Sequence, residues 1–147
     1  RLFRLEADDG THTEVILRQK LDHDVRDLRV SVALDVLVRF QSLSGGGQES
    51  SEFPVIVRLD YRDEWGNSHF WTHGFYYQNQ ARYSIATDAW GNPLGEHIVQ
   101  DVWYSYESGN LPDLLGDSRP MYLTELTIYA SGWNYDSLIS DVQVIVE

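Results

Sequence analysis

The sequence predicts an all-β protein that folds as an antiparallel β-sandwich of about eight strands. Apolar and polar residues alternate with a period of two over residues 28–43, as they do along a half-buried strand. Turn-forming glycine, serine, asparagine and aspartate residues separate this run from others like it, and no segment carries a long helical period. The 147 residues are enough to bury one core, so we expect a single domain over residues 1–147.

The alternating runs give the expected elements in chain order. The expected strands are residues 2–6, 13–19 and 28–43, two runs within 53–79, and residues 97–106, 121–130 and 138–147. The expected connections are residues 21–27, 42–51, 63–67, 80–96 and 131–137. One short helical turn is expected at residues 111–116, because Gly116 can end it.

Residues 53–79 predict a β-hairpin, because two alternating runs flank the polar, glycine-containing residues 63–67. In the first run the apolar side chains fall on one face; they are Val55, Val57, Leu59 and Tyr61. The opposite face of that run carries Arg58, Asp60 and Arg62. In the second run His69, Trp71 and His73 share a face, because side chains alternate along a strand.

This hairpin also provides the first candidate ligand site. If the charged face of the first run continues onto the second, Trp71 lies among polar side chains, namely Arg58, Asp60, Arg62, His69 and His73. The apolar face of a pyranose can stack on an aromatic ring while its hydroxyl groups bind planar polar partners, so such a surface suits a sugar. The alternative is that Trp71 is an ordinary cross-strand packing residue.

Aromatic residues in the expected loops extend the candidate ligand-binding set. Trp65, Trp90 and Trp133 all lie in expected turns or loops. Trp133 is followed by Asn134, Tyr135 and Asp136, and Trp90 lies between Asp88 and Asn92, so each ring has hydrogen-bonding neighbours. We therefore add Trp90, Trp133 and Tyr135 to the predicted ligand-binding residues. These rings could instead close the ends of the sandwich or contact a protein partner.

Charge and composition exclude several classes of function. The formal net charge is −12, from 23 acidic and 11 basic residues, which argues against binding to nucleic acid or to an anionic membrane surface. No apolar run is long enough to insert directly into a membrane. There is no cysteine, and the sequence contains neither a nucleophile elbow nor a His-Glu-x-x-His motif. The sequence therefore predicts a domain that is not an enzyme.

Two oxygen-rich turns offer candidate ligands for Ca²⁺. Asp8 and Asp9 with Gly10 and Thr11 form one cluster, and Asp22, Asp24 and Asp27 form a second. Neither has the spacing of an EF-hand loop, and both could be solvated turn residues.

Several segments resemble the galactose-binding-like jelly rolls, a superfamily that includes many bacterial carbohydrate-binding modules. The similar segments are residues 15–21, the long strand that follows them, residues 129–132 and residues 139–144. The resemblance implies a jelly-roll sandwich and one structural Ca²⁺ near the paired first and last strands. The residues that match its expected ligands are Glu6, Asp8, Asp9 and Asp141.

These observations lead to one expected function and one alternative. We expect a non-catalytic, carbohydrate-binding module of a bacterial extracellular or cell-surface protein. Because residue 1 is Arg, we expect the chain to be a segment excised from a larger extracytoplasmic protein. The alternative is a structural or protein–protein interaction sandwich that packs against a neighbouring protein domain and binds no sugar.

Overall fold

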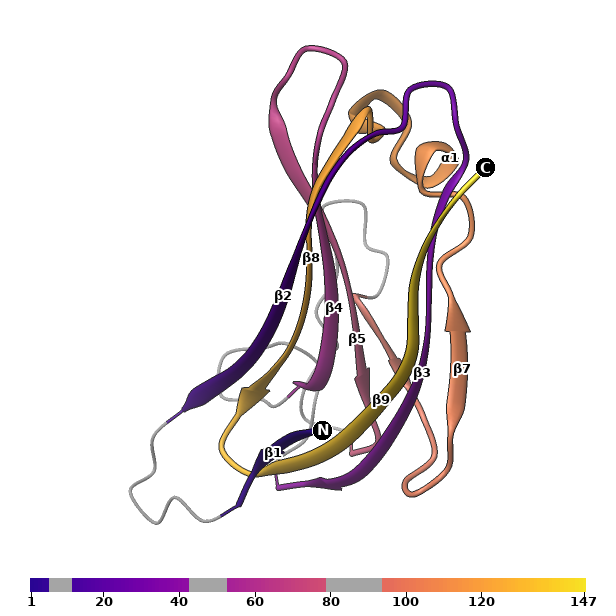
Figure 1. Ribbon diagram of the computed structural model, residues 1–147. Helices are drawn as coiled ribbons and strands as arrows, with labels where there is room; N and C mark the ends of the chain where they lie inside the picture. The colour runs from indigo at the N-terminus through magenta and orange to yellow at the C-terminus, as the bar shows by residue number, and fades with distance from the viewer. Residues whose placement is uncertain (6–11, 43–52, 79–93) are drawn as a thin grey trace.

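A computed structural model describes residues 1–5, 12–42, 53–78 and 94–147 (Figure 1). Within these ranges nine strands form two sheets that pack face to face, which confirms the predicted all-β sandwich. The four-stranded sheet has the order β1 (Leu2–Arg4), β9 (Tyr135–Val146), β3 (Val30–Gln41) and β7 (Tyr104–Glu107). The five-stranded sheet has the order β2 (Thr13–Asp24), β8 (Tyr122–Gly132), β4 (Phe53–Arg62), β5 (Ser68–Tyr76) and β6 (Gly95–His97). All paired strands are antiparallel except β5 and β6.

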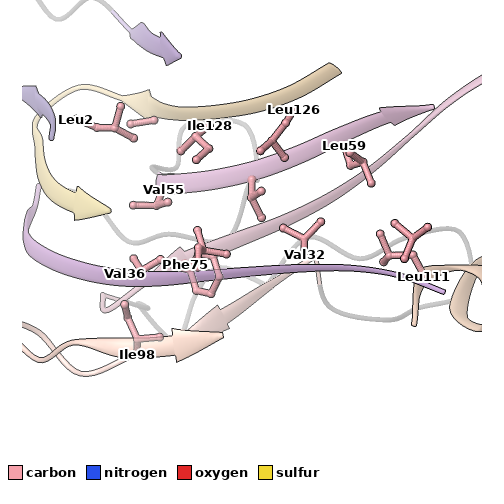
Figure 2. Packing of buried hydrophobic residues seen from close by; sticks show 14 of the residues in the cluster. Leu2, Val32, Val36, Val55, Leu59, Phe75, Ile98, Leu111, Leu126 and Ile128 are labelled. Carbon is pink, nitrogen blue, oxygen red and sulfur yellow. The ribbon is translucent and has the colours of Figure 1, made fainter. Parts of the chain in front are cut away.

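The core lies between the sheets and follows the period-two pattern. On β3 the alternate residues Val30, Val32, Leu34, Val36 and Val38 are buried. On β4 the predicted apolar face is buried as well, while Arg58 and Asp60 are partly exposed and Arg62 is exposed. Figure 2 shows side chains from the two sheets meeting in one layer, with Leu2 and Leu111 toward opposite ends of it. Burial of this apolar surface is the main force that holds the sheets together.

The predicted hairpin is β4, a turn at residues 63–67, and β5. Asp63 organises the turn, because its carboxylate accepts hydrogen bonds from the backbone N–H groups of Trp65 and Asn67 at 2.9 and 2.8 Å. It also binds Asn67 Nδ2 at 3.0 Å and His69 Nε2 at 2.8 Å. Gly66 has a φ of 82°, a conformation that favours glycine.

Three expected boundaries are wrong, each for a local reason. Strand β2 continues to Asp24 through the expected connection 21–27, because a bulge between Lys20 and His23 lets pairing with β8 resume. Residues 97–106 are not one strand but the end of β6, a turn and the start of β7. In that turn Asp101 has a φ of 57° and donates its backbone N–H to Val38 O at 3.0 Å. The expected loop 131–137 is mostly strand, since β8 ends at Gly132 and β9 begins at Tyr135.

The expected helical turn is confirmed as α1 (Leu111–Leu115), followed by the 3₁₀ turn η1 (Gly116–Ser118). Leu111 is fully buried and covers one end of the core. The expected loop at 42–51 lies outside the described residues apart from Ser42, and so does the loop at 80–96 apart from its last three residues.

Candidate functional site

A depression of about 290 Å³ lies on the outer face of the five-stranded sheet. The register of the strands brings the residues that line this depression together, because residues directly opposite each other on neighbouring strands point to the same face. Arg18, Thr127 and Arg58 form one row across β2, β8 and β4, and Glu125 and Asp60 are opposite each other in the next row. The other lining residues are Glu14, Ile16 and Tyr129.

Arg58 is held in one orientation beside this depression. Its Nε and Nη2 atoms donate to the two carboxylate oxygens of Asp60 at 2.9 and 2.5 Å. Its Cζ atom lies 4.3 Å from the ring centroid of Phe70, which is opposite Asp60 on β5. The hydrogen bond with Asp60 raises the pKa of Arg58, so the guanidinium group stays charged. A planar cation fixed between a carboxylate and an aromatic ring presents its remaining N–H groups in a defined direction.

The rest of the lining combines an aromatic ring with balanced charges. Tyr129 is half-buried, and this burial raises the pKa of its hydroxyl group, which stays protonated. Arg18 Nε is 3.8 Å from Glu125 Oε1, and the Thr127 hydroxyl donates to the same oxygen at 3.3 Å. Two arginines therefore face three carboxylates across a small area, an arrangement that suits a neutral polar ligand better than a strongly charged one.

The predicted grouping around Trp71 is wrong. In the β4–β5 register Trp71 is opposite Leu59, His69 is opposite Tyr61 and His73 is opposite Val57, so all three point toward the core layer. Trp71 packs against the core, as the alternative interpretation held. The aromatic residue beside Arg58 and Asp60 is Phe70, whose exposed fraction is 57%.

His73 lies in an aromatic cluster at the edge of the core and not in the depression. Its ring stacks on Tyr106 of the other sheet at 4.4 Å and lies parallel to Trp71 at 6.2 Å. Its Nε2 atom is 3.7 Å from Glu96 Oε2, and both atoms are buried without a hydrogen bond. Burial lowers the pKa of His73, while the charge of Glu96 opposes that effect.

The other predicted ligand-binding residues are dispersed. Tyr135 is fully buried, and its hydroxyl donates to the backbone oxygen of Thr13 at 3.3 Å, so it cannot form an exposed platform. Trp133 is partly buried and makes an edge-to-face contact with His12 at 5.0 Å. Arg62 lies at the far end of β4 and lines a separate depression there. Trp90 lies outside the described residues.

The predicted calcium ligands can be followed only in part. Asp141 is exposed on β9 with a φ of 49°, and its Oδ2 atom accepts a hydrogen bond from the Ser140 hydroxyl at 3.0 Å. Glu6, Asp8 and Asp9 lie outside the described residues. Within the described part of the chain, no three histidine, aspartate or glutamate side chains form a group that could hold a metal ion.

Sequence reasoning missed most of the depression. Glu14, Ile16 and Arg18 alternate along β2, and Glu125, Thr127 and Tyr129 alternate along β8, so each set could be assigned to one face of its strand. What the sequence did not reveal is that β2 and β8 are neighbours, because β2 ends at residue 24 and β8 begins only at residue 122.

In the ranges that the structure describes, no helix is long and apolar enough to cross a membrane. Comparison with known proteins assigns no family: no family model, curated protein or solved structure matches this chain.

Proposed function

We propose that this chain is a non-catalytic glycan-binding module whose ligand lies on the outer face of the five-stranded sheet. The observation that carries the proposal is the fixed orientation of Arg58, between the carboxylate of Asp60 and the exposed ring of Phe70, at the border of a polar depression. The binding residues proposed here are Arg58, Asp60, Phe70, Thr127 and Tyr129.

The chemistry of this face matches the two sides of a sugar ring. Arg58 covers one face of the Phe70 ring, and the exposed remainder of the ring offers apolar area for the C–H face of a pyranose. Arg58 keeps N–H donors that Asp60 does not use, and a guanidinium group can bind two neighbouring hydroxyl oxygens at once. The carboxylate oxygens of Asp60 and Glu125 can accept hydrogen bonds from hydroxyl groups.

The similarity of several segments to bacterial carbohydrate-binding modules supports the same function and an extracellular or cell-surface location. In this proposal a structural Ca²⁺ would stabilise the fold and would not touch the sugar.

A glycan array probed with the purified chain tests the proposal, followed by calorimetry on any glycan that binds. We expect Phe70→Ala and Arg58→Lys each to weaken binding at least about tenfold, because the first removes the stacking surface and the second removes the planar fork. Trp65→Ala is the matched control, since Trp65 is 66% exposed but lies in the 63–67 turn. Circular dichroism should show that all three variants are folded.

Two results would contradict the proposal. One is a wild-type chain that binds no glycan on a broad array in the presence of Ca²⁺. The other is glycan binding that Trp65→Ala abolishes and that Phe70→Ala and Arg58→Lys leave unchanged.

The alternative function is contact with a neighbouring protein domain, and a different surface favours it. Val99, Val102 and Trp103 are all at least half exposed in the turn between β6 and β7. That turn is fixed against β3 by the bond from Asp101 to Val38 and by Gln100 Nε2, which donates to Arg39 O at 2.8 Å. A silent glycan array, together with binding of a hydrophobic dye that Trp103→Ser removes, would favour this function.

A further inference from the structure

Strand β2 is a long edge strand of a kind that soluble proteins usually protect. It runs for 12 residues at the edge of the five-stranded sheet, and within the described part of the chain only β8 pairs with it (Figure 1). The other strands at sheet edges are much shorter: β1 and β6 have three residues each and β7 has four. Short edges and irregular edges discourage pairing with another chain, whereas a long regular edge invites it.

The regular part of β2 is residues 13–20. Its pairing with β8 is continuous there, and the bulge between Lys20 and His23 and the φ of 45° at Asp22 interrupt it only beyond that point. This regular part contains neither proline nor glycine. It therefore keeps the straight hydrogen-bonding edge that a further strand needs.

Apolar side chains on both faces of this edge are exposed to solvent. Ile16 points to the outer face and is 42% exposed. Leu17 is opposite the core residue Ile128 and so points to the inner side, yet it is 66% exposed. The opposing sheet thus leaves the inner side of β2 open at this position.

The charges along β2 are complementary to those of a second, antiparallel β2. If Ile16 lies on the two-fold axis, it is opposite Ile16 of the second copy, and Glu14 is opposite Arg18 of the second copy. Symmetry gives this charge pair twice. The same register places Val15 opposite Leu17 of the second copy on the inner face. Glu14 has no ion-pair partner among the described residues, and Arg18 has only the 3.8 Å contact with Glu125.

We infer that two copies of this chain associate through antiparallel pairing of β2 with β2, in the register that places Ile16 on the two-fold axis. The two five-stranded sheets then form one continuous ten-stranded sheet. Each exposed Ile16 and Leu17 gains a cross-strand apolar neighbour, and each Glu14 gains an arginine. Glu14, Ile16 and Arg18 also line the depression, but none of them is among the proposed glycan-binding residues, so this inference does not depend on glycan binding.

Charge reversal with rescue tests the charge pairing. Glu14→Arg and Arg18→Glu each place like charges opposite each other twice, so either change alone should raise the dimer dissociation constant at least about tenfold in sedimentation analysis. The double variant restores opposite charges in the same positions and should recover dimerisation. Any repulsion between Arg18→Glu and Glu125 is present in the single and the double variant, so it cannot account for the rescue. Arg39→Glu, an exposed reversal on β3, is the matched control.

Disulfide crosslinking tests the register, because the chain has no cysteine of its own. Directly opposite residues of an antiparallel pair have Cα atoms about 4.5–5.5 Å apart, which is within the range that a disulfide spans. Ile16→Cys should therefore give a covalent dimer on mild oxidation, while Leu17→Cys and the control Val102→Cys should remain mostly monomeric.

Three results would overturn the inference. The first is a wild-type chain that stays monomeric across a concentration series. The second is a dimer that neither single charge reversal weakens. The third is crosslinking through Leu17→Cys in place of Ile16→Cys, which would show a different register.

Discussion

Two histidines of strand β5, each paired with a carboxylate from outside the strand, show how differently the same chemical groups behave along one strand. His69 and Asp63 lie at the turn, 2.8 Å apart, and the carboxylate has three further hydrogen bonds. His73 lies four residues farther along β5, and its Nε2 atom is 3.7 Å from Oε2 of Glu96 on β6; both of these atoms are buried without a hydrogen bond. The first pair is a satisfied network, while the second is an incomplete one inside an aromatic cluster.

The pKa shifts of Asp63 and His73 follow from this difference in hydrogen bonding. Burial by itself would raise the pKa of Asp63, but hydrogen bonds from His69, Asn67 and Trp65 outweigh it and lower the pKa to about 2. At His73 burial dominates and lowers the pKa, since one distant carboxylate does not compensate for the lost solvation. The comparison shows that hydrogen-bond geometry decides whether a buried charge is stabilised.

The largest effect should follow from breaking the satisfied pair. Asp63→Ala leaves the turn donors of Trp65, Asn67 and His69 without their acceptor, so we expect the melting temperature to fall by about 5 °C or more. Glu64→Ala, in the same turn but exposed, should change it by no more than about 2 °C. Thermal unfolding followed by circular dichroism measures both. Equal effects of the two changes would show that Asp63 does not organise the turn.

Titration of His73 and of Asp63 should each lower the stability of the fold, in separate pH ranges. Because the pKa of His73 is lower in the folded chain than in the unfolded chain, the unfolded chain binds a proton at a higher pH. The stability of the fold therefore falls as the pH drops through the ordinary histidine value near 6.5. The lowered pKa of Asp63 means that its contribution is complete above the ordinary value of 3.8 and is lost as the pH falls toward about 2.

Melting temperatures measured from pH 8 to pH 2 check this prediction. His73→Phe should remove the loss near pH 6 and leave the acid loss intact. A variant that keeps the loss near pH 6 would assign that loss to another group.

The smallest effect should follow from replacing the incomplete pair at neutral pH. His73→Phe keeps a ring that can stack on Tyr106 and removes a buried nitrogen that has no hydrogen bond. We expect the free energy of unfolding at pH 8 to change by less than about 1 kcal/mol, in either direction. Urea denaturation measures it, and a loss several times larger would show that His73 has a partner that stabilises the fold.

The strands were predictable and the pairing between them was not. Alternation identified the buried face of β3 and the two faces of β4, because each depends on one strand alone. The grouping around Trp71 failed because register decides it: Arg62 pairs with Ser68 across a five-residue turn, so even-numbered residues face even-numbered ones. The expected turn at residues 63–67 already has this length, so the error lay in continuing the charged face of β4 onto the odd-numbered residues of β5.

Tyr135 shows a second limit of sequence reasoning. Its polar neighbours indicated a loop, but the turn between β8 and β9 needs only Trp133 and Asn134, and the strand that follows carries Tyr135 into the core. The length of a polar run therefore overestimates the length of a turn when paired strands continue into it.

The sheet order described above has a consequence for folding. Strand β1 pairs with β9 and β2 pairs with β8, so in both sheets an N-terminal strand is completed by one of the last two strands of the chain. During synthesis both edges of β2 stay unpaired until β8 has been made. Such long-range pairings also form slowly. Strand β2, whose free edge we assign to dimerisation, is thus exposed to aggregation while the chain is being made.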